Sequence, residues 1–227
     1  MLEMEITQVA ARCLSRLKFE GFDVLACDDF ERVSDLFPET GRHAQTPMMD
    51  VRRLDFTQGQ AFWLFVTQED AVVGGLAAKS IKLKNERFDD FLRRTTKHQY
   101  GFELDPIAEV ATPVVEAISG DLIYFGELEF KSDFRGNASV LRDVSRVSKC
   151  LAAMRWPDFD WMYSFIPDEH FKFAKAYDFN LVVPEAIRWS SAPSGRLNSH
   201  WIMANNSSQF IHWIGVRQRE LTLHPPE

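Results

Sequence analysis

The chain has 227 residues, 45% of them hydrophobic, which is enough to bury one sizeable core. Its 33 acidic residues outnumber its 26 basic residues, and the net charge of −7 excludes a general nucleic-acid-binding surface. No apolar run reaches the roughly 18 residues of a membrane span. The N-terminus has acids and no signal-peptide core, and the three cysteines form no metal or redox motif, so we expect a cytoplasmic protein with buried thiols.

The N-terminal third alternates between helical and strand patterns. Apolar residues from Ile6 to Leu17 recur at helical spacing, and Gly21 follows as a stop signal. Two apolar runs further on are separated by a polar turn, which predicts a hairpin. The expected elements are a helix over 6–17, a strand over 22–27, a helix from 28 or 29 to about 37, and strands over 61–67 and 71–83.

Two insertions, about 39–60 and 84–121, interrupt this pattern. The second contains a charged helical piece over 85–95, and residues 106–111 predict another short helix. Connections of this length inside a compact domain are usually functional or disordered. The two insertions hold the one concentration of basic residues, which is either a solvated face or a surface for an acidic partner protein or a ligand phosphate. This basic set is Arg52, Arg53, Arg93, Arg94 and Lys97.

Residues 122–154 predict a strand, a tight turn and a long amphipathic helix. Alternation puts Tyr124, Gly126, Leu128 and Phe130 on one face of the strand, and Phe125, Glu127, Glu129 and Lys131 on the other. In the helix, Arg142, Asp143, Arg146 and Lys149 fall on the polar side. Gly136 allows a positive φ in the turn, and the first helical N–H groups together with the helix dipole favour a phosphate or pyrophosphate there.

The pattern Leu128-x-Phe130-x-x-x-Phe134-Arg135-Gly136-x-Ala138-x-x-Leu141 resembles the central motif of the GNAT acyltransferase superfamily. The resemblance implies an α/β (α+β) fold over residues 1–227 as a single domain. Its central sheet is mixed, mostly antiparallel and flanked by helices, here with a long insertion between the third and fourth strands. Asp133 departs from the family, which often has Gln or Arg at that position.

The resemblance also implies that the loop amides bind the pyrophosphate of acetyl-CoA or another acyl-CoA, which acts as co-substrate. The residues carried over as cofactor-binding are Leu128, Phe130, Phe134, Arg135, Gly136, Asn137, Ala138 and Ser139.

The C-terminal part continues the same order of elements. We expect a strand over 161–166, a helix over 168–175, closing strands over 181–190 and 200–204, and a final helix over 208–221 that packs on the core or on a second subunit. Residues 173–179 resemble the family's F-Y-x-x-x-G-F segment. The family's frequent general-acid tyrosine falls at Ala174 and its glycine at Asp178, while Tyr177 lies one helical turn from Ala174.

Acyl transfer to an amine needs a group that accepts the amine proton, a stabilised oxyanion and a group that receives the leaving thiolate. In the family the attack is direct, and the oxyanion lies against a backbone N–H of the central strand, here near 128–130. The predicted catalytic residues are Glu127, then Glu129, as base and Tyr177 or Tyr163 as acid; Ser164 can orient a substrate. No metal is predicted, because the histidines lack ligand spacing.

The sequence therefore predicts transfer of an acyl group from acyl-CoA to a primary amine of a small molecule or peptide. One alternative is an N-acyl amino acid or acyl-homoserine lactone synthase that uses an acyl-carrier protein. In either case the protein could form a homodimer. The other alternative is a non-catalytic GNAT-fold binding protein, consistent with Asp133 and Ala174. A synthase predicts a deep apolar tunnel, a small-acyl transferase a shallow slot, and a non-enzyme a cleft filled by Phe165 or a tryptophan.

Overall fold

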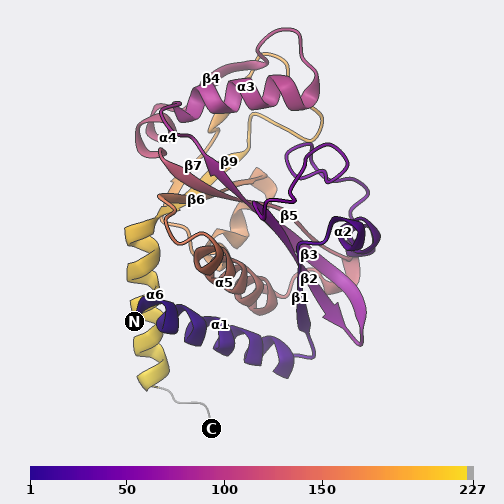
Figure 1. The fold of residues 1–227 in the computed structure, drawn as a ribbon, viewed down its shortest axis with the longest axis vertical. Coiled ribbons are helices and arrows are strands. Elements are labelled where there is room, and N and C mark those ends of the chain that lie inside the picture. Colours follow the sequence, from indigo (N-terminus) through magenta and orange to yellow (C-terminus); the bar gives the residue numbers. More distant parts are fainter. Residues whose placement is uncertain (224–227) are drawn as a thin grey trace.

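The structure is a computed structural model and describes residues 1–223. A seven-stranded sheet in the order β1-β2-β3-β5-β6-β9-β7 runs through its centre (Figure 1). Every neighbouring pair is antiparallel except β5 and β6, which are parallel. The mixed, mostly antiparallel sheet flanked by helices is as predicted. The strands are β1 (Asp23–Cys27), β2 (Ala61–Gln68), β3 (Ala71–Lys82), β5 (Asp121–Phe130), β6 (Trp161–Ile166), β7 (Leu181–Val183) and β9 (Trp201–Asn206).

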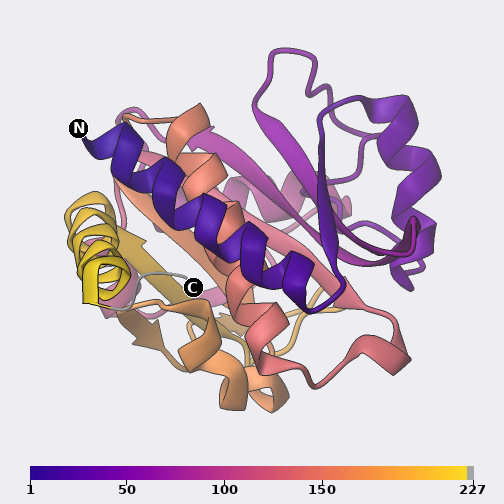
Figure 2. The same cartoon turned by 90° about the horizontal axis from the view of Figure 1, so that it is seen from below.

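Helices cover both faces of the sheet. Those that begin and end the chain, together with α5, pack on one face, and Figure 2 shows α1 crossing that face close to α5. The remaining helices lie over the opposite face with a second buried cluster. The helices are α1 (Leu2–Phe19), α2 (Phe30–Leu36), α3 (Phe88–Tyr100), α4 (Thr112–Ala117), α5 (Ala138–Arg155) and α6 (Ser207–Leu223), with 3-10 turns η1 (Phe37–Thr40), η2 (Ser132–Phe134) and η3 (Asp168–Tyr177).

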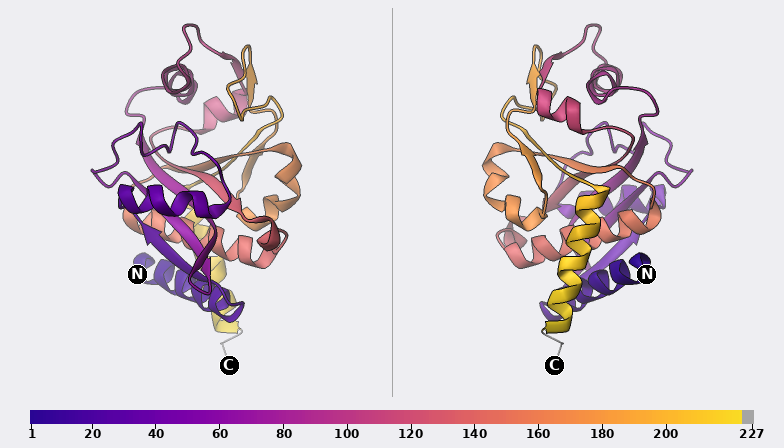
Figure 3. Two further views of the ribbon diagram at one scale, coloured as in Figure 1. Left: turned by 90° about the vertical axis from the view of Figure 1, so that its right-hand side faces the viewer. Right: turned by 90° about the vertical axis from the view of Figure 1, so that its left-hand side faces the viewer.

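Apolar spacing explains the first of these layers. Ile6, Val9, Cys13 and Leu17 recur on one side of α1 and are all buried against the sheet and α5. In α6, the buried Phe210 and Ile214 join the same cluster, so the final helix covers this chain's own core. Figure 3 shows α6 extending along the molecule towards the C-terminus. Cys13, Cys27 and Cys150 are buried free thiols, as expected.

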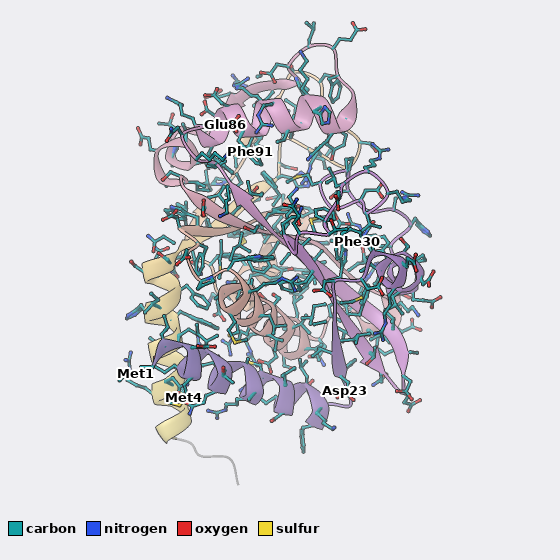
Figure 4. The ribbon with its side chains drawn as sticks, in the orientation of Figure 1. Met1, Met4, Asp23, Phe30, Glu86 and Phe91 are labelled. Atoms are coloured by element: carbon teal, nitrogen blue, oxygen red, sulfur yellow. The ribbon has the colours of Figure 1, made fainter. Side chains whose placement is uncertain are left out.

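The insertion between β3 and β5 forms the end of the molecule remote from α1. Figure 4 labels Glu86 and Phe91 there, on the opposite side of the sheet from Met1 and Met4. The helix predicted over 106–111 is wrong: Ile107–Val110 is a strand, β4, and α4 follows it. These residues form a strand because β4 pairs with β8 (Ile187–Trp189), and no local sequence pattern indicates that pairing.

Two further segments differ in detail from their predicted secondary structure. The segment 181–190 is not one strand, because Glu185 has a φ of +46° and turns the chain between β7 in the main sheet and β8 beside β4. The helix predicted from Asp168 forms as the 3-10 turn η3. Asp178, at the position of the family's glycine, ends η3 in the left-handed conformation with φ +50°.

Candidate active site

A β-bulge interrupts β5 at Glu127. Gly126 pairs with Ala77 and Glu129 pairs with Gly75, so Glu127 and Leu128 together oppose one residue of β3. Glu127 takes a φ of +61°, which is unusual for a residue with a side chain. The bulge reverses the alternation of the strand, so the predicted face was wrong: Leu128 and Phe130 pack on the α5 side with Phe125, and Tyr124 packs on the other side.

The same part of β5 separates from β6. The parallel pairing runs from Leu122 with Trp161 to Phe125 with Ser164 and then stops. Beyond that point, the edge of β5 that faced β6 borders a cavity of about 660 Å³. A parallel pair that parts in this way leaves backbone N–H groups facing the space between the strands. The cavity has the size of a small-molecule site.

Segments remote in sequence complete the cavity wall. The first predicted insertion contributes Arg42, residues 44–47 and Arg53, and the second contributes Gln99 and Tyr100. Helix α5 contributes Ser145, Ser148 and Lys149, and the loop before β9 contributes 194–196. Ser164, Phe165, His170 and Tyr177 lie along its other side. Phe165 therefore lines the cleft rather than filling it, and the polar α5 side chains differ from the apolar tunnel expected of a synthase.

Glu127 is the buried acid of the cavity, with its side chain 1% exposed. Its carboxylate accepts hydrogen bonds from the backbone N–H and the hydroxyl of Thr46, and it pairs with Arg42 Nε at 3.1 Å. A carboxylate has about four acceptor sites, so one remains for a ligand. Arg42 and Thr46 belong to the first insertion, and sequence reasoning did not find them because nothing local links them to β5.

Glu129 also lines the cavity, in a different environment. Its carboxylate lies 2.9 Å from Arg135 Nη2, and its side chain is 28% exposed. The bulge thus brings both predicted carboxylates to one cavity, with one enclosed and the other near solvent. Tyr163 is wholly buried outside the cavity lining, whereas Tyr177 forms part of that lining.

Tyr177 is held in place from beneath. Lys149 Nζ donates to the backbone oxygens of Tyr177 and of Asp178, the latter at 3.0 Å, and it lies 3.6 Å from the Phe179 ring centroid. Burial lowers the pKa of Lys149 to about 7, and burial raises the pKa of Tyr177 to about 12. Tyr177 therefore keeps its proton at neutral pH.

The polar side of α5 is largely buried. Asp143, Arg146 and Lys149 are buried because η3 and α1 cover that side of the helix, and the Arg146 guanidinium lies over the ring of Trp213 from α6. Arg146 Nε lies 2.7 Å from Asp178 Oδ2, and Arg16 Nη2 lies 2.5 Å from Asp143 Oδ1. Charged residues at helical spacing cannot by themselves show that another element covers them.

The loop predicted to bind the cofactor, 134–139, lies outside the cavity lining at the exposed start of α5. Gly136 has a φ of +90°, and a side chain there would meet nothing within 4 Å. Asn137 caps the helix by accepting from the N–H groups of Ser139 and Val140. Arg135 turns back onto the strand, where Nε donates to the Phe130 oxygen at 2.8 Å.

An acid occupies the anion position at this helix N-terminus. Glu20, from the end of α1, accepts hydrogen bonds from Ser139 Oγ at 2.8 Å and from Asn137 Nδ2 at 3.0 Å. In contrast, the Asp133 carboxylate is exposed and accepts from Ser132 Oγ. An anion at this helix N-terminus would have to displace Glu20 from these contacts.

The predicted basic set is largely neutralised. Asp50 pairs with Arg52 at 2.9 Å and with Arg53 at 3.3 Å, Arg93 lies 2.5 Å from Asp105, and Arg94 lies 2.7 Å from Glu86. Arg53 also donates to the Gln99 backbone oxygen, which ties the two insertions together beside the cavity. These pairs reduce the positive field that the sequence suggested for an acidic partner.

Two features are absent from residues 1–223. No helix there has both the length and the apolar composition needed to cross a bilayer. The same residues contain no group of three or more His, Cys, Asp or Glu side chains placed to hold a metal ion.

Comparison with known proteins finds distant structural similarity. No family model and no curated protein matches the sequence. Among solved structures, the chain is similar to a probable acetyltransferase from Staphylococcus epidermidis, with 7% identity, a TM-score of 0.47 and coverage of 82% of this chain and 99% of that one. It is also similar to Arabidopsis thaliana NAA60 in complex with acetyl-CoA, with 13% identity, a TM-score of 0.43 and coverage of 82% and 98%.

A third similar structure is FeeM, an N-acyl amino acid synthase from uncultured soil microbes, with 11% identity, a TM-score of 0.43 and coverage of 82% and 90%. Similarity at this level of identity and TM-score transfers no activity to this chain.

Proposed function

We propose that this protein is a single-domain N-acyltransferase of the GNAT type, which moves an acyl group from acyl-CoA to a primary amine. The observation that carries the proposal is the parting of β5 and β6 at Phe125 and Ser164. A bulge, a cavity of about 660 Å³ and an exposed helix N-terminus follow one another along the same strand. This order suits a donor that runs from the helix terminus into the cavity.

At the start of α5, backbone N–H groups are the part of the protein proposed to bind the acyl-CoA donor. The N–H groups of Gly136, Asn137 and Ala138 make no hydrogen bond within residues 1–223, and the positive end of the α5 dipole lies behind them. These groups fit a pyrophosphate. Leu128 and Phe130 shape the strand that leads from this loop to the bulge.

The chemistry requires no covalent enzyme intermediate. The amine nitrogen attacks the thioester carbonyl carbon, the carbon–sulfur bond breaks, and an amide and the free thiol of CoA result. Glu127 binds the amine with its remaining acceptor site and receives its proton, with Glu129 as the second choice for this role. A β5 backbone N–H near 128–130 stabilises the oxyanion.

Tyr177 donates its phenolic proton to the departing thiolate and takes a proton back from solvent, while Glu127 releases the amine proton to solvent. Its raised pKa, about 12, keeps the phenol protonated at neutral pH. Lys149 holds the backbone at Tyr177 and Asp178, so the phenol has a fixed place in the cavity wall. Ala174 has no hydroxyl group, and Tyr177 supplies the only phenol of η3.

Calorimetric titration with acetyl-CoA and octanoyl-CoA tests the proposal. We expect the wild type to bind at least one of them, and Gly136→Trp to raise the dissociation constant at least about tenfold by blocking the loop. Gly101→Trp is the matched control, because Gly101 also has a positive φ, +70°, and nothing within 4 Å, at a helix end away from the loop. Binding of neither donor to the wild type would overturn the proposal.

A further inference from the structure

Arg196 is a cation in the cavity wall that the proposed chemistry does not use. It lies in the loop before β9, half-buried, with its guanidinium carbon 4.9 Å from the centroid of the Phe165 ring. Nη2 lies 3.8 Å from Met48 Sδ, so the side chain spans from its own loop to the first insertion. A guanidinium placed over an aromatic ring is held in a defined orientation.

No carboxylate within residues 1–223 pairs with Arg196. The two acids of the cavity have arginine partners of their own: Arg42 for Glu127 and Arg135 for Glu129. The polar neighbours of Arg196 are phenols. Burial lowers the pKa of Arg196, but the nearby hydroxyls of Tyr124 and Tyr100 outweigh burial and raise it, so the group stays charged.

The phenol of Tyr124 joins this cation to the proposed amine site. A Cβ at Gly126 would lie 2.6 Å from Tyr124 Oη, so the ring folds over that glycine at the start of the bulge. Burial raises the pKa of Tyr124, with Arg196 opposing and Glu127 adding to that effect, because both charges lie near the phenol. Arg196 and Glu127 therefore carry opposite charges in the lining of one cavity, and Tyr124 lines the same cavity.

Opposite charges in one cavity lining suit a ligand that carries both an amine and a carboxylate. Arginine binds carboxylates through two parallel N–H donors, and a half-buried guanidinium without an acidic partner is suited to one. We propose that the acceptor is an amino acid, whose carboxylate Arg196 binds while Glu127 holds its amine. This proposal rests on the proposed acyltransferase function and specifies its substrate class.

Acceptor pairs that differ only in the carboxylate test this proposal. Free thiol release and amide formation are measured with L-amino acids and with the amines that result from their decarboxylation, such as L-phenylalanine and 2-phenylethylamine. We expect the wild type to acylate at least one amino acid at least about tenfold more efficiently than its amine partner. Mass spectrometry of the product confirms that the amine nitrogen is acylated.

Variants of Arg196 assign the effect to this residue. Arg196→Gln should raise the KM for the amino acid by about 10- to 100-fold, with kcat and the decarboxylated amine little affected, and Arg196→Lys should recover part of the loss. Arg188→Gln is the matched control, since Arg188 is an exposed arginine on β8 that pairs with Glu109 outside the cavity.

The possible outcomes distinguish the amino-acid acceptor proposal from the acyltransferase function on which it rests. If amines are acylated but the carboxylate confers no advantage, or if Arg196→Gln leaves that advantage intact, the acceptor proposal is wrong and the acyltransferase function stands. If the wild type binds no acyl-CoA, both fail together.

Discussion

The turn after β5 and the gap between β5 and β6 lie only a few residues apart on one strand, yet their polar groups are satisfied in different ways. In the turn, Arg135 pairs with Glu129 and Asn137 caps its own helix, so most partners are neighbours in the sequence. In the gap, the Glu127 carboxylate accepts hydrogen bonds from Thr46, which is 81 residues away in the sequence. A local motif can specify the first arrangement, whereas the second exists only after two insertions have packed against the sheet.

The comparison predicts that the two carboxylates of β5 are not interchangeable. Glu127→Gln should lower kcat by about 10²- to 10⁴-fold, because the buried acid cannot be replaced as proton acceptor, whereas Glu129→Gln should change it by less than about tenfold. Steady-state kinetics of both variants, with acyl-CoA binding as a check on folding, provide the measurement. Equal losses would show that the bulge does not distinguish the two acids.

The junction between the two regions depends on Gly74. A Cβ there would lie 2.4 Å from Phe130 Cδ1 and 2.7 Å from the Glu129 oxygen, so Gly74→Ala forces β3 and β5 apart. We expect a loss of about 1–3 kcal/mol in the free energy of unfolding, measured by chemical denaturation. In Gly215→Ala the new Cβ would lie 3.8 Å from the Nη1 atom of Arg219, one turn along the same helix, so this variant should lose little. Similar losses in both variants would contradict the steric explanation.

Lys149 beneath the gap should make stability depend on pH. Its pKa is about 7 in the folded protein and near its ordinary value of 10.5 when unfolded. Between these values the unfolded state binds more protons, so the free energy of unfolding rises with pH, by up to about 1.4 kcal/mol per pH unit. Denaturation at pH 7 and pH 9 should give a smaller rise for Lys149→Met than for the wild type. Parallel profiles would show that burial does not perturb this lysine.

The smallest expected effect concerns the turn. Glu20→Gln removes a negative charge from the start of α5 but keeps an acceptor for Ser139 and Asn137. Acyl-CoA should then bind about three- to tenfold more tightly, with a larger gain at low salt, because one charge repelling a pyrophosphate is lost. Glu3→Gln, at the opposite end of α1, serves as control. An unchanged affinity would place the donor away from this helix N-terminus.

Sequence patterns predicted the elements that bury a continuous apolar side. Ile6 to Leu17 in α1 and the hairpin of β2 and β3 follow from spacing alone, because one packed face is enough to define each of them. Prediction failed where a partner decides the conformation. Residues 107–110 become a strand only because 187–189 lie beside them, and Lys149 is buried only because η3 covers its side of α5.

The sequence by itself determined the helix cap at Asn137, the left-handed turn at Gly136 and the buried side of α1, since each depends on residues within a few positions of one another. The tertiary structure alone decided the bulge at Glu127 and the placing of Arg42 and Arg196 around one cavity. The reason is physical. Capping and periodicity act over one or two turns of chain, whereas the charge around a cavity depends on which distant side chains the packed fold brings within hydrogen-bonding distance.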